Sequence, residues 1–461
     1  MNITVLRACA AAIAAVACVS ICGGALAGEA KPNIVYVVAD DLGWKDVGYH
    51  GSDIKTPNID ALAKAGVKLE QFYAQPMCTL VIPAGESYGL PTDEYLLPQA
   101  LADAGYETAI VGKWHLGHGD QKFWPKQRGF AYQYGPLIGE IDYFTHEAEG
   151  VVDWYRNNEL VKEEGYSTQL LGDDAVKLID GHDTSRPLFL YLAFNAPHTP
   201  YQAPVEYLAR YKRVADPSRR AYAGSITAMD DQIGRVLAAL EKRKMRASTL
   251  IVFQSDNGGT RNAMFSGAIA DMSKVKIPCD NGPYREGKGS LYEGGTRVVA
   301  LANWPGHIRS GTTSNEILHV VDMYPTLAGL AGAPTSKAKP LDGLDVWPTL
   351  GEGKPSPRTE VVYNLEPMRA GIREGDWKLV WRTMLPSVSE LYDIADDPSE
   401  KHDLAAQHPD KVAALQKRAN ELAAAGVKPM LLEVWFKALL QERGHAPPAF
   451  PGEELEFDSE N

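Results

Sequence analysis

Cysteine is scarce in this chain, with five in 461 residues. Three of them, Cys9, Cys18 and Cys22, lie in the first 22 residues, so Cys78 and Cys279 are the only two in the rest of the chain. Two cysteines cannot form a network of disulfides. A small domain held together by disulfide bridges is therefore excluded.

Basic charge is also limited. The chain carries 46 Lys and Arg against 59 Asp and Glu, a formal net charge of −13, and it contains no run of Lys and Arg that would act as a local basic patch. A broad basic surface, which a nucleic-acid backbone requires, is absent, so we expect no nucleic-acid partner. With 45% hydrophobic residues, the chain can bury at least one large core and is not a disordered protein.

No long apolar run predicts a stable membrane span. The longest N-terminal run extends from Ala8 to Ile21, follows the single charge of Arg7, and precedes the small-x-small sequence 25–27. These three parts are typical of a secretory signal, so we predict a signal peptide over residues 1–27 and an exported protein, periplasmic or secreted. The alternatives are a membrane anchor or a lipid attached at Cys22, but the bulky Ile21 argues against the lipid.

Four short, almost wholly apolar runs end abruptly in polar residues, and amphipathic segments lie between them. Runs of this kind are typical of parallel strands that are covered on both faces. The alternation of strands and helices predicts an α/β sandwich with a mostly parallel central sheet flanked by helices. The expected strands are residues 33–41, 107–115, 188–198 and 249–257, and the expected helices are 57–66, 95–106 and 222–242.

The composition changes after Pro348, where residues 351–360 are rich in Gly, Pro and charge. Beyond this connection we expect a strand pair at 375–383 and 389–405 and an amphipathic helix at 408–424. We therefore predict a signal peptide (1–27), a main α/β domain (28–350) and a smaller C-terminal α+β domain (351–461).

Acidic residues follow two of the predicted strands. Asp40 and Asp41 end the first, and Asp256 and Asn257 end the last. One such pair alone would be interpreted as a capped loop. Side chains that follow the carboxyl ends of parallel strands lie close together. These four offer oxygen donors of the kind that Ca²⁺ or Mg²⁺ prefers.

Cationic side chains occupy corresponding positions. Lys113 and His115 follow the second strand, His198 follows the third, and Lys288 lies in a glycine-rich segment. Singly, each fits a surface lysine or a hydrogen-bonded histidine of the core. Together with a divalent cation they can neutralise an oxyanion and protonate a leaving oxygen, which indicates a site for sulfate or phosphate monoesters.

These segments resemble the type I sulfatases of the alkaline phosphatase superfamily, from KPNIVYVVADDLGW to LYDIADDPSEKHDLA. GYETAIVGKWHLGH resembles the second family signature, NAPHTPY and SDNGG its histidine and metal segments, and REGKGSLYEGGTRV its second lysine segment. The resemblance implies hydrolysis of sulfuric esters. It also implies calcium bound by Asp40, Asp41, Asp256 and Asn257, sulfate contacts from Lys113, His198 and Lys288, and His115 beside the nucleophile.

The family's nucleophile is a formylglycine made from a cysteine by a formylglycine-generating enzyme, and by position that cysteine is Cys78. The family pattern continues with a proline two residues later and an arginine in the fifth place, whereas here Thr79 is followed by Leu80-Val81-Ile82. The interval from Cys78 to Lys113 is also shorter than the family's by about fifteen to twenty residues. We therefore predict that Cys78 stays a thiol and that turnover is very low.

Three alternatives remain at this point. The chain is a phosphate or phosphonate monoester hydrolase of the same superfamily, a catalytically silent homologue that binds sulfate esters, or a sequence that lacks a segment present in the natural protein. The GKWHLG and NAPH segments favour sulfate. The substrate, an aryl sulfate or a sulfated sugar, is not predicted, because Trp124, Tyr143 and Trp154 can either line a pocket or fill the core.

Overall fold

The computed structural model describes residues 31–77, 88–261, 277–366, 368–383 and 386–426. The predicted signal peptide and Cys78 lie outside the described residues. Within them, no helix is both long and apolar enough to cross a membrane.

A mixed sheet of ten strands forms the centre of the fold. Its four central strands are mutually parallel, as are β4–β5 and β13–β2, and the other neighbours are antiparallel. The order across the sheet is β13 (Thr312–Ser314), β2 (Val67–Leu69), β12 (Ala300–Asn303), β11 (Thr249–Ser255), β1 (Asn33–Ala39), β10 (Leu188–Ala193), β4 (Glu107–Gly112), β5 (Tyr132–Gly135), β8 (Tyr155–Arg156) and β9 (Glu159–Leu160).

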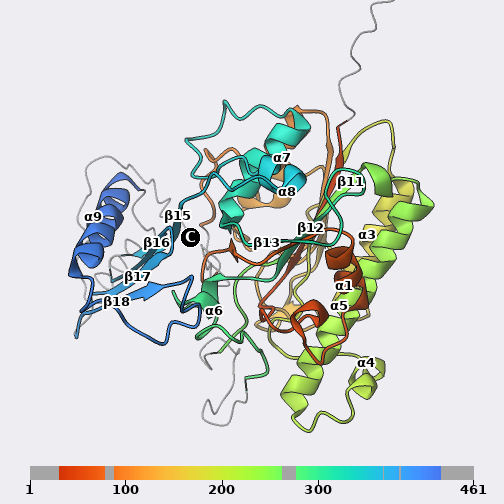
Figure 1. Cartoon of the computed structure of the whole chain (residues 1–461). Helices are drawn as coiled ribbons and strands as arrows, with labels where there is room; N and C mark the ends of the chain where they lie inside the picture. Colours follow the sequence, from red (N-terminus) through yellow and green to blue (C-terminus); the bar gives the residue numbers. More distant parts are fainter. Residues whose placement is uncertain (1–30, 78–87, 262–276, 367, 384–385, 427–461) are drawn as a thin grey trace, which may run out of the picture. The chain divides into compact units, whose positions relative to one another are not determined.

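Helices cover both faces of this sheet, as Figure 1 shows for α3 and α5 on one side and α7 and α8 on the other. Successive residues of β1 point to opposite faces, so Val35 and Val37 pack with α1, α3 and α5, while Ile34 and Tyr36 pack with α2, α7 and α8. The helices are α1 (Pro57–Lys64), α2 (Leu97–Asp103), α3 (Ser167–Gly181), α4 (Val205–Arg210), α5 (Pro217–Lys242), α6 (Glu293–Thr296), α7 (Met323–Ala331) and α8 (Trp347–Glu352).

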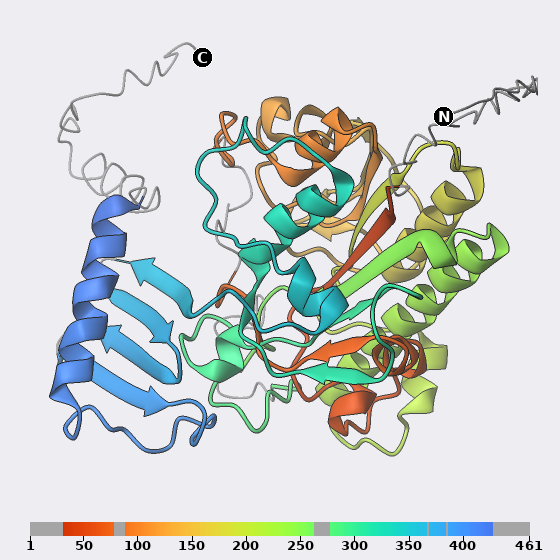
Figure 2. The same cartoon turned by 45° about the horizontal axis from the view of Figure 1, so that its top comes forward.

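The C-terminal part is a four-stranded antiparallel sheet with one helix, α9 (Pro409–Ala425), across one face (Figure 2). Its strands are β15 (Glu360–Glu366), β16 (Arg369–Glu374), β17 (Trp377–Arg382) and β18 (Val388–Asp393). Leu415 and Ala419 of α9 pack on this sheet. Two further pairs are short: β3 (Phe72–Tyr73) with β14 (Leu318–His319), and β6 (Glu147–Ala148) with β7 (Val151–Val152).

The predicted fold class is confirmed: a mostly parallel sheet between helices with a small C-terminal sheet. Two details differ. The longest helix begins at Pro217 rather than 222, because Asp216 caps it and its first turn is polar. The C-terminal sheet has four strands rather than a pair, since β15 and β16 follow the segment interpreted as a connection. The domain boundary at 350 stays a prediction.

Candidate active site

The predicted site residues lie beyond the carboxyl ends of four neighbouring strands. Asp40 and Asp41 follow β1, Lys113 and His115 follow β4, His198 follows β10, and Asp256 and Asn257 follow β11. Lys288 comes from the loop before α6, and that loop is attached to the site because the Lys288 N–H donates to the Gly259 carbonyl at 3.2 Å. The structure therefore brings the eight described candidates to one edge of the sheet.

Asp41 is the most connected member of this cluster. Its carboxylate accepts from the Lys288 ammonium at 2.9 Å and from the Asn257 amide at 2.7 Å. The Thr260 hydroxyl donates to it at 2.9 Å, and His198 Nε2 lies 3.5 Å from Asp41 Oδ2. A buried carboxylate with so many partners is held in one orientation.

Asp40 pairs with Lys113, whose Nζ lies 2.7 Å from Oδ2. Among the described residues, the other oxygen, Asp40 Oδ1, is buried without a hydrogen-bond partner, and so is Asn257 Oδ1. Unpartnered buried acceptors are costly and call for an explanation. Atoms of Asp40, Asp41 and His198 that can bind a metal also lie within 4.8 Å of one another, close enough to share one ion.

The backbone around these ligands is also specialised. Asp41 and His115 both adopt left-handed conformations, with φ of 65° and 56°. Asp256 Oδ1 accepts from the N–H groups of Asp41 at 3.0 Å and of Asn257 at 2.9 Å, which joins the ends of β1 and β11. The Tyr143 hydroxyl contacts the carbonyl oxygens of Asn195 and His198, both at 2.8 Å, and so anchors the His198 turn.

Burial and neighbouring charges shift the protonation equilibria of the cluster. Burial and the nearby carboxylates of Asp40 and Asp41 raise the pKa of Asp256 to about 8. Burial acts in the same direction on Asp41, but Lys288 and His198 outweigh it and hold its pKa well below the usual range. Burial and the Lys113 ammonium lower the pKa of His115 well below its usual value, which favours a neutral imidazole. Carboxylates that repel one another and share lysines are typical of a site that binds an additional positively charged group.

A cavity of about 410 Å³ opens beside the cluster. Asp40, Lys113, His115 and Asp256 line its charged end, and the remainder is lined mainly by apolar side chains, among them Leu97, Trp114, Phe130, Phe189 and Phe194. Met77 also lines it, and it immediately precedes the predicted nucleophile.

Sequence reasoning missed the role of Thr260 and left three aromatic residues open. Trp124, Tyr143 and Trp154 are all buried and are not among the residues that line this cavity, so they belong to the core. Thr260 stands three residues after Asn257 within the glycine-rich segment, but a single threonine in a turn carries no distinctive signal.

The chain belongs to the sulfatase family: residues 32–333 match the family described as Sulfatase. Residues 286–425 match a second family, described as N-sulphoglucosamine sulphohydrolase, C-terminal.

Among curated relatives, arylsulfatase J of Mus musculus is 36% identical over 391 residues, 78% of this chain and 63% of that protein. N-acetylgalactosamine-6-sulfatase of Mus musculus is 32% identical over 400 residues, 78% of this chain and 74% of that protein. The crystal structure of Ps i-CgsB in complex with k-i-k-neocarrahexaose is 32% identical, with a TM-score of 0.78 over 89% of this chain and 97% of that one.

Proposed function

We propose that this chain is a sulfuric ester hydrolase that binds the sulfate group of its substrate beside a divalent cation. Ca²⁺ is the favoured ion and Mg²⁺ the alternative, with Asp40, Asp41, Asp256 and Asn257 as ligands. The observation that carries the proposal is the pair of buried, unpartnered oxygens, Asp40 Oδ1 and Asn257 Oδ1, in a cluster that also holds two lysines and two histidines.

The charged side chains have distinct roles in this proposal. Lys113 and Lys288, each held by a carboxylate, neutralise the sulfate oxygens. His198 Nδ1 lies 2.8 Å from the Thr199 carbonyl oxygen, so Nε2 is the nitrogen that faces the site and exchanges a proton with the ester oxygen. His115, kept neutral, is able to accept a proton from a nucleophile. Calcium, when bound, supplies positive charge that stabilises the anionic group.

We propose that catalytic turnover is impaired, which makes a silent sulfate-ester-binding homologue the second candidate function. It is favoured by the sequence after Cys78, where Leu80 and Ile82 stand in place of the proline and arginine of the family pattern. Formylglycine formation at Cys78 is accordingly not expected. The substrate class that we propose is a sulfated sugar, because relatives named above act on N-acetylgalactosamine-6-sulfate or bind a neocarrahexaose.

Calcium and anion binding can be tested on the purified full chain without turnover. We expect calcium in large excess over its Kd to raise the melting temperature relative to chelator, because a ligand at 100 times its Kd stabilises a fold by about 2.7 kcal/mol. Asp256→Ala should abolish this shift. Asp230→Asn is the matched control, since Asp230 is also buried but binds the backbone of Asn58 and Ile59 instead.

Calorimetric titration with a sugar monosulfate in calcium gives the second measurement. We expect binding that the double variant Lys113→Ala, Lys288→Ala removes, while the calcium-induced shift of that variant shows that it still folds. The proposal is wrong if calcium stabilises neither the native chain nor Asp230→Asn, or if the double variant binds the monosulfate as the native chain does.

A further inference from the structure

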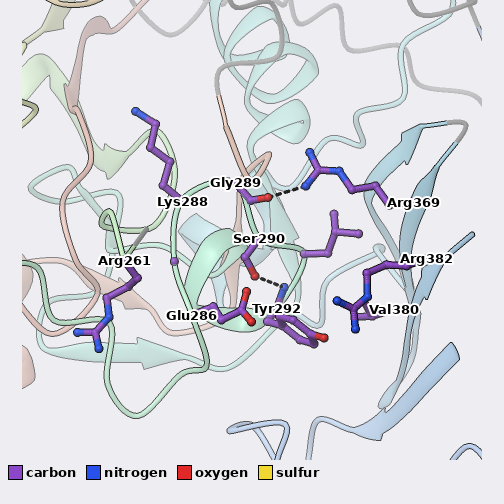
Figure 3. Close-up of a pocket in the computed structure, with 11 residues that line it drawn as sticks. Arg261, Glu286, Lys288, Gly289, Ser290, Tyr292, Arg369, Val380 and Arg382 are labelled. Carbon is purple, nitrogen blue, oxygen red and sulfur yellow. Dashed lines mark hydrogen bonds between the residues drawn. The ribbon is translucent and has the colours of Figure 1, made fainter. Parts of the chain in front are cut away.

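A second cavity, of about 440 Å³, lies on the other side of Lys288. Loop residues 286–292 form its floor, and side chains of β16 and β17 form one wall. Figure 3 shows Arg369 and Arg382 on that wall and Arg261 on the opposite side of the loop. The cavity thus lies where the main part of the chain meets the C-terminal sheet.

The lining of this cavity is basic although the chain is strongly acidic. Three of its lining residues, Arg261, Arg369 and Arg382, present guanidinium groups to it, against the single carboxylate of Glu286. In a chain of net charge −13 such a cluster is unusual. A concave surface lined by one sign of charge concentrates ligands of the opposite sign.

The three arginines differ in how strongly they are held. Arg369 is fixed by a two-point contact with Glu366, at 2.8 and 3.2 Å, and by the Gly289 carbonyl at 2.6 Å. Arg382 makes one long contact of 3.6 Å with Glu390, and its side chain is 46% exposed. Arg261 donates to the Cys279 carbonyl at 3.1 Å. Arg382 and Arg261 therefore retain guanidinium donors for a ligand.

Lys288 connects this cavity to the carboxylate cluster. Its backbone lines the arginine side, while its ammonium contacts Asp41. The two sites therefore share this residue. We propose that the cavity binds a second anionic group, a sulfate or a carboxylate, of the same saccharide, so that the preferred ligand is an oligosaccharide with at least two anionic groups. This inference rests on the proposed function and specifies its substrate class.

The test compares three disaccharides that share one 6-sulfated N-acetylgalactosamine and carry, on the other sugar, no charge, a uronate carboxylate or a second sulfate. Calorimetry in calcium at low salt should give a Kd about tenfold lower for at least one dianionic ligand than for the monosulfate. The double variant Arg261→Gln, Arg382→Gln should lose this tenfold difference and bind the monosulfate as before. Raising the salt concentration should reduce the difference, because exposed charges are screened.

Arg210→Gln is the matched control, because Arg210 is 47% exposed and pairs with Asp231 on a different part of the surface. It should retain the tenfold preference. If the monosulfate binds and neither dianion binds more tightly, or if the double variant keeps the preference, this inference is wrong while the proposed function stands. If none of the three disaccharides binds, the proposed function fails and takes this inference with it. The two dianions distinguish a carboxylate from a sulfate as the second group.

Discussion

In the proposed function, Cys78 is the residue from which the nucleophile beside the charged cluster derives. Gln75 and Met77, which precede Cys78, line the same cavity as Lys113 and His115. Cys78 itself lies outside the described residues. Conversion of a cysteine to formylglycine depends on the short sequence that follows it. We therefore propose that the residues at positions 80 and 82 affect catalysis through this modification.

We expect the chain, produced together with a formylglycine-generating enzyme, to retain an unmodified thiol at position 78 by peptide mass spectrometry. Its aryl sulfatase rate should not exceed that of Cys78→Ala. The variant Leu80→Pro, Val81→Ser, Ile82→Arg restores the linear pattern and should show the aldehyde mass, which controls for the activity of the modifying enzyme. An aldehyde at position 78 of the unaltered chain, with hydrolysis that Cys78→Ala abolishes, would contradict this expectation.

Single residues were predictable where the signal is local. Asp40, Asp41, Asp256 and Asn257 each follow directly on an apolar strand, and parallel strands bring such positions together. Thr260 was not predictable in the same way, because its contact with Asp41 spans 219 residues. The same holds for the Tyr143 hydroxyl, which contacts backbone 52 and 55 residues away.

At the scale of elements, β4 positions Lys113 through the close approach of its last residue to β10. Gly112 has φ of +119°, and a Cβ there would lie 1.8 Å from the Ala193 carbonyl oxygen. That same oxygen accepts the Lys113 N–H at 2.9 Å. Only glycine allows both the backbone conformation and the contact.

Gly112→Ala should therefore destabilise the fold by more than 2 kcal/mol and weaken monosulfate binding, because β4 must move away from β10. Gly105→Ala is the matched control: Gly105 precedes the same strand, has φ of +90°, and has open space where a Cβ would lie. It should cost only about 1 kcal/mol and leave binding unchanged. Chemical unfolding and calorimetry on both variants give the comparison. Equal costs in the two variants would show that backbone conformation, rather than strand spacing, is what Gly112 provides.

Among the elements, strands that are buried on both faces were the ones that the sequence predicted. The four central strands were predicted from continuous apolar runs, and all four lie side by side in the sheet. β15 and β16 were missed because neither is a continuous apolar run: buried and half-buried residues alternate in β15, and Arg369, Gly371 and Arg373 interrupt β16. Each of them pairs with a neighbouring strand along the chain, and no local sequence pattern identifies that pairing.

At the scale of the whole molecule, a buried ionic cluster joins the C-terminal sheet to α6 and β3. The Lys378 ammonium, fully buried on β17, lies 2.8 Å from Glu293 of α6 and 2.9 Å from Glu400 after β18. The Tyr73 hydroxyl donates to Glu293 at 2.8 Å. Burial raises the pKa of Glu400 to about 7. The Lys378 ammonium opposes this shift, and the Glu293 carboxylate adds to it. Breaking such a cluster leaves unpaired charge in the interior.

This shift predicts a pH dependence of stability. The folded-state pKa of Glu400 lies above its unfolded value near 4.5, so the folded state binds the extra proton and the stability from this group is lost as pH rises from about 4.5 to 7. Glutamine does not titrate, so the variant Glu400→Gln does not lose this stability as the pH rises. Relative to the native chain, the variant should gain on the order of 2 kcal/mol between pH 5 and pH 8, as measured by urea unfolding.

The exposed Glu421 on α9 supplies the control, and Glu421→Gln should behave as the native chain at both pH values. A difference between Glu400→Gln and the native chain that stays constant from pH 5 to pH 8 would contradict the assignment. We also expect probes in either sheet to report one unfolding transition, because the cluster connects the C-terminal sheet to α6 in the main part of the chain.

The ionic cluster also has a consequence for biosynthesis. Glu293 leaves the ribosome 85 residues before Lys378 and 107 before Glu400. Until β17 emerges, the nascent main sheet can complete its central strands but has no ammonium for this carboxylate. Closure around Glu293 therefore waits for the last strands to be translated. Ribosomal pausing between codons 300 and 378 would lengthen the interval in which chaperones must protect the incomplete chain.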